Sequence, residues 1–366
     1  MKKWKTELKR RLQHPTPLRP LQSWEEQIVQ TIKEETARNN VNNVTRTAAY
    51  LSFYLRFPEI HWAFLAHMVS RNGGWNMTDL KGGLLKSLLD NDEKESIFAF
   101  LERGNWLIFQ DAFPQLMLYE CSVKYNQNLF DLLPYFGVSR FMEAMWSFFW
   151  EERDQETLAI ATIINEQNYI ESRVIQHKTY KNSVLNTWGF QLYDVLPFNH
   201  ILLPFVETNQ NVRPHLAGAT VQHFASLSRR IEFGKSLYHL LFHKPSLRQK
   251  VLNWAASHPH TGSRADYWND IFHPIKMTIV KDRYQKRIDH CRLKKEALPI
   301  HSPTLQAAWK NVDHEQPDSN DWFQDLSVLR FFKKGKPLDG DILDDYCRTI
   351  DLLELAVIAR QILSMV

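Results

Sequence analysis

Two short polar segments hold most of the side chains that could do chemistry. The first spans residues 71–81 and contains two adjacent glycines together with five candidate ligand-binding residues, Arg71, Asn72, Asn76, Asp79 and Lys81. Adjacent glycines permit a tight turn with exposed N–H groups, and such a turn beside cationic side chains could receive an anion. The alternative is a structural network, with Arg71 paired to a buried acid and Thr78 or Asp79 capping the next helix.

The second segment, residues 257–268, reads SHPHTGSRADYW and supplies four more candidates, His258, His260, Ser263 and Arg264. Two histidines and several hydroxyls in one turn could bind phosphate or a metal ion. Equally, Ser263 could cap a short helix. We predict that the two segments meet in space. Arg71 ends a helix with little polar surface and keeps its charge when buried, and this turn, with Asp266, is the richest remote source of acceptors.

Two further constellations could hold metal ions. His239 and His243 lie four residues apart and could grip zinc from one helix, but their stripe contains Glu232 and Lys235, so a solvated surface is favoured. Carboxylates also occupy apolar positions at Glu59, Glu120, Glu143 and Glu166. Di-metal bundles need Glu-x-x-His, which none of these provides, so pairing with Arg46, Arg140 or Arg173 is favoured. The sequence assigns no metal ligand, cofactor or catalytic residue.

Two classes of function remain open. The standard motifs of nucleotide binding, α/β hydrolysis and zinc proteolysis are missing. The favoured hypothesis is a binding or scaffold protein with a polar pocket near residues 71–81. The alternative is an enzyme acting on a small phosphate- or anion-bearing ligand, or a metal-assisted hydrolase, with its site between the 71–81 and 257–268 turns.

Composition favours helices. The 366-residue chain has only 12 glycines and many Leu, Phe, Trp and Ala residues, which argues against a β-sandwich. A net charge of +4 without a basic stripe gives no reason to expect nucleic acid as a partner. The one basic cluster, residues 1–12, predicts an amphipathic helix that could touch an anionic membrane. Because three prolines follow it, a loosely attached, solvated helix is the favoured interpretation.

The cysteines and the apolar segments indicate where in the cell the protein is expected. Cys121, Cys291 and Cys347 are far apart and show no metal-ligand spacing. Their odd, sparse count predicts a reducing compartment. No apolar stretch of the secretory kind follows the basic N-terminus. The C-terminal run 350–366 is broken by charges, so it predicts no lipid-exposed membrane helix. We therefore expect a cytoplasmic protein with no transmembrane segment.

The elements that must position these residues are predicted to be all-α. We expect a basic, loosely attached segment over 1–20, one large multi-helix domain over 21–290 and a helical C-terminal extension over 300–366. Three nearly all-apolar helices, 59–71, 141–150 and 158–164, should lie at the centre. The first should end in a left-handed cap at Asn72-Gly73-Gly74. Other helices are predicted at 23–39, 45–57, 93–103, 106–122, 139–152, 155–175, 179–194, 217–243, 246–257, 320–333 and from 339.

The last helix carries an apolar seam. Its members alternate by four and three residues, as in helices that pack on one another, and they are Tyr346, Ile350, Leu353 and Val357. The seam could meet a protein partner or a second copy of the chain.

Three strings in the sequence resemble an uncharacterised family of bacterial proteins, the YppC-like proteins of Bacillus and related Firmicutes. They are NNVTRTAAY (42–50), PEIHWAFLAHMVSRNGGWNMTDLKGG (58–83) and HPHTGSRADYW (258–268). The resemblance covers about residues 25–285 and is carried mainly by the long 58–83 string. It implies a cytoplasmic Firmicutes protein and supplies no catalytic residue.

Overall fold

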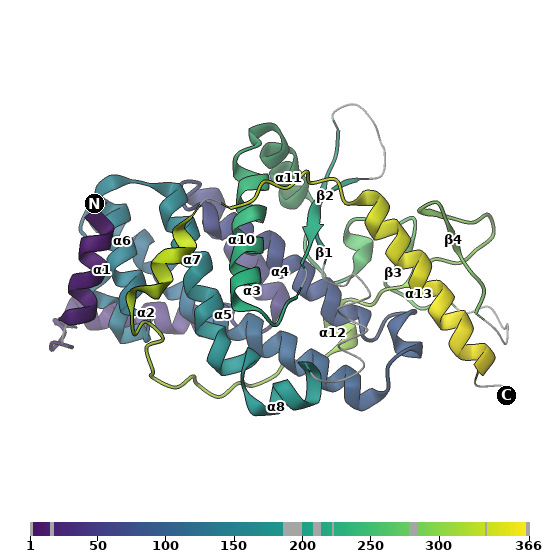
Figure 1. The fold of residues 1–366 in the computed structure, drawn as a ribbon, viewed down its shortest axis with the longest axis horizontal. Coiled ribbons are helices and arrows are strands. Elements are labelled where there is room, and N and C mark those ends of the chain that lie inside the picture. Colours follow the sequence, from purple (N-terminus) through teal and green to yellow (C-terminus); the bar gives the residue numbers. More distant parts are fainter. Residues whose placement is uncertain are drawn as a thin grey trace.

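The computed structural model describes residues 3–14, 18–185, 200–207, 214–221, 223–277, 284–333 and 335–363 (Figure 1). Over these ranges the protein is mostly helical and elongated, with its N-terminal and C-terminal helices at opposite ends. None of the helices described is long and apolar enough to cross a membrane.

The N-terminal half forms a helical body. Side chains cap several of its helices: Asn42, Asp90, Ser139 and Asp154 each accept a hydrogen bond from a first-turn N–H group. In chain order the elements are α1 (Lys3–Gln13), α2 (Ser23–Asn39), α3 (Asn43–Arg56), α4 (His61–Asp79), the 3-10 turn η1 (Leu85–Ser87), α5 (Asn91–Tyr125), η2 (Phe130–Phe136), α6 (Arg140–Glu152), α7 (Gln155–Ile170), the π-helical turn η3 (Glu171–Ile175), α8 (Lys178–Tyr180) and the π-helical turn η4 (Lys181–Leu185). Residues 186–194 of the predicted 179–194 helix lie outside the described ranges.

The predicted end of the helix at Asn72-Gly73-Gly74 is wrong. α4 continues through both glycines to Asp79, and neither glycine has a positive φ. Gly74 serves close packing instead, because a Cβ built there would lie 2.2 Å from Asn43 Oδ1 and 2.4 Å from His260 Nε2. Residues 71–79 therefore form the last turns of a buried helix.

A single helix, α5, replaces the two that we predicted at 93–103 and 106–122. It runs for 35 residues and contains both Gly104 and Pro114. No atom lies within 4 Å of a Cβ built on Gly104, so this glycine is neither a packing requirement nor a helix end. The continuous helix is held by burial of Phe109, Phe113 and Leu116 on its core side.

Alanine at Gly104 and at Gly74 should change stability in opposite directions. Gly104→Ala adds a methyl group in open space on a helix and should stabilise the protein by about 0.5–1 kcal/mol. Gly74→Ala forces a Cβ against buried Asn43 and His260 and should destabilise it by about 1–3 kcal/mol. Chemical denaturation of both variants measures the two effects. A Gly74→Ala protein that is as stable as the wild type would contradict the packing role of this glycine.

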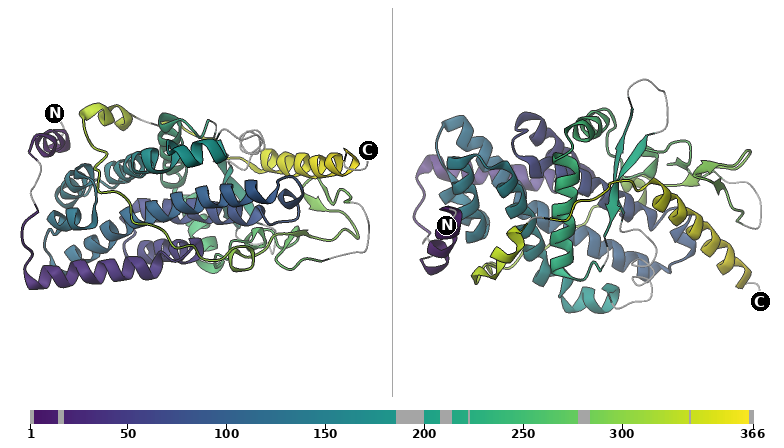
Figure 2. Two further views of the ribbon diagram at one scale, coloured as in Figure 1. Left: turned by 90° about the horizontal axis from the view of Figure 1, so that it is seen from below. Right: turned by 45° about the horizontal axis from the view of Figure 1, so that its top comes forward.

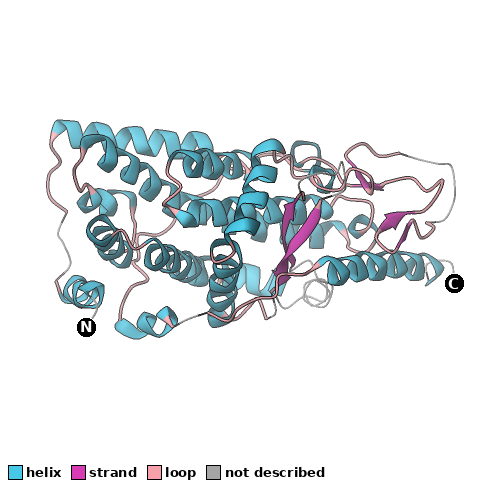
Figure 3. Ribbon diagram, turned by 90° about the horizontal axis from the view of Figure 1, so that it is seen from above, coloured by secondary structure: helices cyan, strands magenta, loops and turns pink. Residues whose placement is uncertain are grey.

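The all-α prediction is wrong in one respect, because the second half of the chain contains small sheets (Figure 3). β1 (His200–Phe205) pairs antiparallel with β2 (His215–Thr220). β3 (Phe272–His273) pairs parallel with β6 (Ile300–His301), and β4 (Ile288–Asp289) pairs antiparallel with β5 (Arg292–Leu293). The helix predicted over 217–243 starts only at Leu227. The two-residue strands β3 to β6 are too short to show an alternating pattern, and the burial of the six-residue strands β1 and β2 does not alternate.

Helices of the second half pack around these sheets. They are α10 (Leu227–Phe242), α11 (Pro245–Ser257), the 3-10 turn η5 (Arg264–Asp266), α12 (Leu305–Ala308), the 3-10 turn η6 (Leu326–Phe332) and α13 (Leu343–Leu363). Figure 2 shows α13, in yellow, at the end of the molecule opposite α1.

The apolar seam of α13 is covered by the chain itself. α13 packs against β2, β4 and η1. The four seam residues expose 4% of their surface or less; they are Tyr346, Ile350, Leu353 and Val357. The seam therefore belongs to the core, and our prediction that it could meet a partner is wrong.

The central helices are placed as predicted. Phe64 of α4, Trp146 of α6 and Ile164 of α7 are at most 1% exposed. Burial of each such side chain contributes roughly 1.5–3 kcal/mol to stability.

The N-terminal basic helix is fixed to this core rather than loosely attached. α1 packs against α6, and Trp4 and Leu8 are 2% and 0% exposed. Arg11 Nη1 donates to Glu143 Oε2 at 2.5 Å. The apolar face that suggested a membrane contact is thus buried in the protein.

Two of the three cysteines are paired. Cys291 and Cys347 form a disulfide with a Cα–Cα distance of 5.3 Å, which ties the β4–β5 turn to α13. Cys121 is free. The predicted reducing compartment rested on the odd, sparse cysteine count, and the disulfide between two of the three cysteines removes the support for that inference.

Candidate functional site

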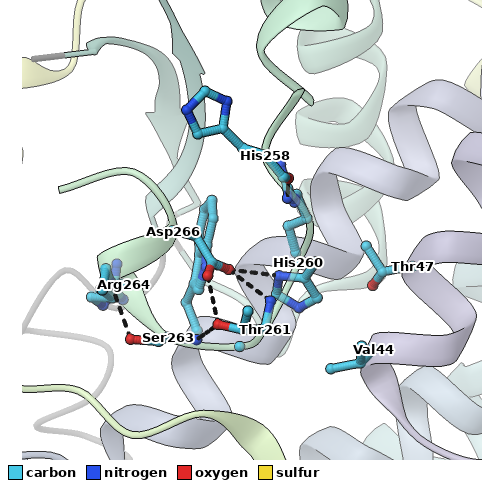
Figure 4. Close-up of polar contacts among 12 residues, drawn as sticks. Val44, Thr47, His258, His260, Thr261, Ser263, Arg264 and Asp266 are labelled. Atoms are coloured by element: carbon cyan, nitrogen blue, oxygen red, sulfur yellow. Dashed lines mark hydrogen bonds and ion pairs between the residues drawn. The ribbon is translucent and has the colours of Figure 1, made fainter. Parts of the chain in front are cut away.

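The two polar segments meet, as predicted, and we call their meeting point the junction. Arg71 Nη2 donates a hydrogen bond to the carbonyl oxygen of His258, 187 residues along the chain. Arg264 Nη2 donates to Asn76 Oδ1 at 3.1 Å. Thr78 Oγ1 adds a third bridge by donating to the Gly262 carbonyl at 2.5 Å. The junction thus joins the last turns of α4 to the loop after α11, and Figure 4 shows the loop side chains that form it.

Arg264 is the centre of the junction. Its Nε donates to both carboxylate oxygens of Asp79, at 2.8 and 3.0 Å. Its Nη1 donates to the hydroxyls of Tyr267 and Tyr346, at 2.7 and 2.9 Å. Burial raises the pKa of the Asp79 carboxyl, and the guanidinium opposes that rise. Each guanidinium nitrogen has an acceptor, so this pair is a satisfied internal ion pair.

His260 joins the junction to α3. Its Nε2 lies 2.8 Å from Asn43 Oδ1, and its Nδ1 lies 3.2 Å from Asp266 Oδ2. Burial lowers the pKa of the His260 ring. Asp266 also accepts from Trp75 Nε1 at 3.2 Å. Asp266 is therefore held by His260 and Trp75, and it is not the hydrogen-bond acceptor of Arg71 that we expected.

Arg71 lies beside this network, and only some of its hydrogen-bond donors have an acceptor. Its side chain is fully buried, and its guanidinium carbon lies 4.5 Å from the ring centre of Trp254. Among the described residues its Nε and Nη1 have no hydrogen-bond partner. Burial lowers its pKa to about 10, which still leaves it cationic at neutral pH.

Two sequence candidates anchor neighbouring elements. Asn72 pairs with the backbone of Leu202 in β1, donating at 2.9 Å and accepting at 2.7 Å. The Lys81 ammonium lies 4.2 Å from the ring centre of Trp309, just after α12. Neither side chain makes a hydrogen bond to the 257–268 turn among the contacts of the described residues.

The remaining two candidates organise the loop itself. Ser263 Oγ accepts from the Ala265 N–H, which caps η5, and donates to the Ser302 carbonyl at 2.5 Å. The His258 ring stacks on Trp254 with centroids 5.0 Å apart. Ser263 is therefore a helix cap, which was the alternative to a ligand contact.

The junction leaves little space for a ligand. The cavity that reaches Asp79, Arg264 and Tyr346 has a volume of about 30 Å³. That volume is room for roughly one water molecule. These contacts favour the structural interpretation of the junction.

A larger cavity, which we call the central chamber, lies among the helices of the body. Its volume is about 160 Å³, and side chains of α3, α4, α5, α7, α10 and β1 line it. Ser70, which precedes Arg71, lines it and receives a hydrogen bond from Asn43, so the chamber adjoins the junction. Its apolar walls include Leu65, Val69, Ile108, Ile163, Phe224, Phe233 and Leu237.

Glu166 and Tyr50 are polar side chains among these walls. Glu166 Oε2 accepts from Trp62 Nε1 at 3.0 Å. Burial raises the pKa of Glu166 to about 8, so the carboxyl is mainly protonated at neutral pH. The Tyr50 ring packs edge-on against Trp62 with centroids 5.4 Å apart. Glu166 was already notable in the sequence as a carboxylate in the apolar run of α7. The cavity beside it could not be predicted, because it is formed by residues that are far apart in the sequence.

The arginines of the chamber wall are already neutralised. Arg46 Nη2 lies 2.5 Å from Glu102 Oε2, and Arg230 pairs with Glu171. With Glu166 protonated, the chamber therefore presents an almost uncharged interior.

The raised pKa of Glu166 should make stability fall as pH rises. The folded state holds this proton up to about pH 8, whereas the unfolded carboxyl releases it near its ordinary pKa of about 4.5. Between these values the folded state binds more protons, so each pH unit should remove at most about 1.4 kcal/mol through this group. Burial also raises the pKa values of Asp111 and Glu143, to about 7, with the same sign.

Urea unfolding of wild type and Glu166→Gln at pH 5, 6, 7 and 8 measures this effect. In Glu166→Gln the unfolding free energy should fall less steeply with pH than in wild type. The remaining pH dependence should come from Asp111 and Glu143. Identical slopes in the two proteins would show that Glu166 is not protonated in the folded state.

Comparison with known proteins places the chain in a family. The family model described as "Protein of unknown function (DUF2515)" matches residues 38–341. The chain belongs to this family. It is 43% identical to "Uncharacterized protein YppC" of Bacillus subtilis (strain 168) over 321 residues, which cover 87% of this chain and 91% of that protein. The YppC-like resemblance is therefore confirmed, and it extends beyond the residues 25–285 that we predicted. No solved structure matches the chain.

Proposed function

We propose that this protein binds a small uncharged molecule in the central chamber. The observation that carries the proposal is an apolar cavity of about 160 Å³ with a half-buried carboxyl, Glu166, in its wall; burial raises the pKa of that carboxyl to about 8. Large apolar pockets with a few convergent polar groups are the default binding sites of proteins. A binding protein is the favoured class of our sequence analysis, but the proposed pocket is apolar and adjoins residue 71, whereas we predicted a polar pocket near residues 71–81.

Volume and polarity define the ligand class. A dry apolar cavity of about 150 Å³ is large enough to take benzene, so a single ring is the expected size. Glu166 and Tyr50 can exchange hydrogen bonds with one hydroxyl or N–H group on that ring. Because Arg46 and Arg230 are already paired, the chamber offers no free charge to an anionic ligand.

The junction is proposed to support the chamber. A role of the nine candidate residues as ligand contacts remains a prediction. Their hydrogen bonds instead support a role in fixing α4 in position. An enzyme acting on an anion between the two turns has less support, because Arg264 is already paired with Asp79 and the cavity there is small.

We keep the cytoplasm as the proposed location, although the Cys291–Cys347 disulfide weighs against a reducing compartment. Labelling of thiols in intact cells tests it, because a cytoplasmic chain should carry Cys291 and Cys347 largely reduced. A pair found oxidised in cells would argue for an oxidising compartment.

Titration with phenol tests the proposed function. Wild type should bind phenol and gain stability, by about 2.7 kcal/mol at a ligand concentration a hundred times the Kd. Ala66 lines the chamber, so Ala66→Phe should fill it and abolish binding. Ala256→Phe, at an exposed position of α11, is the matched control and should bind as wild type does.

A second variant keeps the test decisive if Ala66→Phe does not fold. Tyr50→Phe removes one hydroxyl and should weaken phenol binding while leaving toluene binding unchanged. Absence of binding of phenol, indole and toluene to wild type would contradict the proposal, as would binding that survives in folded Ala66→Phe.

A further inference from the structure

His239 lies in the last turn of α10 and His243 is the residue directly after this helix, and their imidazoles are in contact. The two Nδ1 atoms are 3.1 Å apart, and the ring planes are nearly perpendicular at 80°. Two nitrogens on one helix, four residues apart, are the usual start of a zinc site. On the sequence alone this pair was better explained as a solvated helix surface, because its stripe also contains Glu232 and Lys235.

The structure supplies a third donor from a different helix. Glu156 lies in the first turn of α7, and its Oε2 is 3.4 Å from His243 Nε2. Taking one ligand atom from each side chain, the donor atoms of Glu156, His239 and His243 all lie within 4.8 Å of one another. Among the described residues this is the group of three that could hold a metal ion.

We propose that Glu156, His239 and His243 bind a divalent first-row transition metal, with zinc as the expected ion. Two imidazole nitrogens and one carboxylate oxygen are the donor set of zinc sites that keep a fourth position open. The side chains of Glu156 and His243 are each 51% exposed, so water can reach that fourth position. The bound ion would tie the start of α7 to the end of α10.

Neighbouring side chains hold the two rings and leave the carboxylate available. Buried Tyr238 packs against both histidines, with centroid distances of 5.7 and 6.1 Å. Gly335 lies close to His239, since a Cβ built there would be 3.1 Å from His239 Cδ2. Other carboxylates nearby are engaged: Asp154 caps Thr157, and Glu232 pairs with Lys235 at 2.8 Å. This site is separate from the chamber, and the proposal does not depend on the proposed function.

The test is metal titration of the full chain, prepared without a histidine tag and treated with chelator. Wild type should bind one Zn²⁺ per chain by calorimetry, and Co²⁺ at the same site should give visible absorption bands. Loss of a ligand should weaken Zn²⁺ binding at least as much as loss of a supporting residue does, roughly tenfold or more. The two ligand variants are His243→Ala and Glu156→Gln.

Two controls make the outcome decisive. Glu156→Gln changes an exposed side chain by one atom, so circular dichroism should show an unchanged fold even if His243→Ala is perturbed. His290→Asn removes an imidazole that is 94% exposed elsewhere and should leave Zn²⁺ affinity unchanged. Wild type that binds no Zn²⁺, Glu156→Gln that binds as wild type does, or equal losses in His290→Asn would each overturn the site.

Discussion

Replacing Arg264 with alanine should lower the free energy of unfolding by about 3–5 kcal/mol, as for other broken buried ion pairs. Arg264 is 6% exposed, and its Nη2 lies 2.7 Å from Asp79 Oδ2. Its removal leaves the Asp79 carboxylate buried without its partner. The hydroxyls of Tyr267 and Tyr346 also lose the hydrogen-bond donor that they share. Most of the loss of stability comes from leaving these buried polar groups without a hydrogen-bond partner, and less comes from the lost ionic attraction.

Urea denaturation of Arg264→Ala at pH 7 measures this loss. The matched control is Arg229→Ala on α10, where the side chain is exposed and the change should stay within about 0.5 kcal/mol. Replacing both partners, as in Arg264→Met with Asp79→Leu, should recover part of the stability. If Arg264→Ala costs no more than Arg229→Ala does, the junction does not hold the fold.

A second large loss is expected for Trp146→Ala, about 3–5 kcal/mol. Trp146 is 1% exposed, and its ring stacks between Phe130 and Tyr119 at centroid distances of 5.1 and 5.6 Å. Its Nε1 donates to Gln115 Oε1 at 2.8 Å. Alanine therefore opens a cavity and also leaves a buried amide oxygen without its donor.

Two further tryptophan variants separate these causes. Trp146→Phe keeps most of the ring and should cost less than alanine does. Trp24→Ala, at a side chain that is 39% exposed, should cost far less than Trp146→Ala. Equal losses at positions 24 and 146 would contradict the placement of α6 at the centre of the core.

The meeting of the two polar segments was predictable, whereas its pairings were not. A buried guanidinium needs acceptors, which is enough to predict that Arg71 reaches the 257–268 turn. The acceptor turned out to be the backbone carbonyl of His258, which has no signature in the sequence. Arg264 became the centre because Asp79 of α4 and Tyr346 of α13 converge on it, together with Tyr267 of its own turn.

Predictions made from neighbouring residues were wrong where contacts between distant segments determine the local structure. Gly73 and Gly74 have the sequence of a helix cap, yet α4 passes through them because Asn43 and His260 press against Gly74. β2 is short and rich in small residues, and its pairing with β1 comes from a distant segment. The central chamber depends on side-chain volumes from six elements at once, so its existence lies beyond any periodicity argument.

The most direct test of the proposed function is a crystal soaked with 4-bromophenol and measured at the bromine absorption edge. The bromine atom is visible by anomalous scattering, which locates the ring without reliance on weak density. We expect the anomalous peak inside the central chamber, between Ile163 and Leu237, with the hydroxyl directed to Glu166 or Tyr50. A chamber that stays without bromine at saturating ligand, or bromine bound only at the surface, would contradict the proposal.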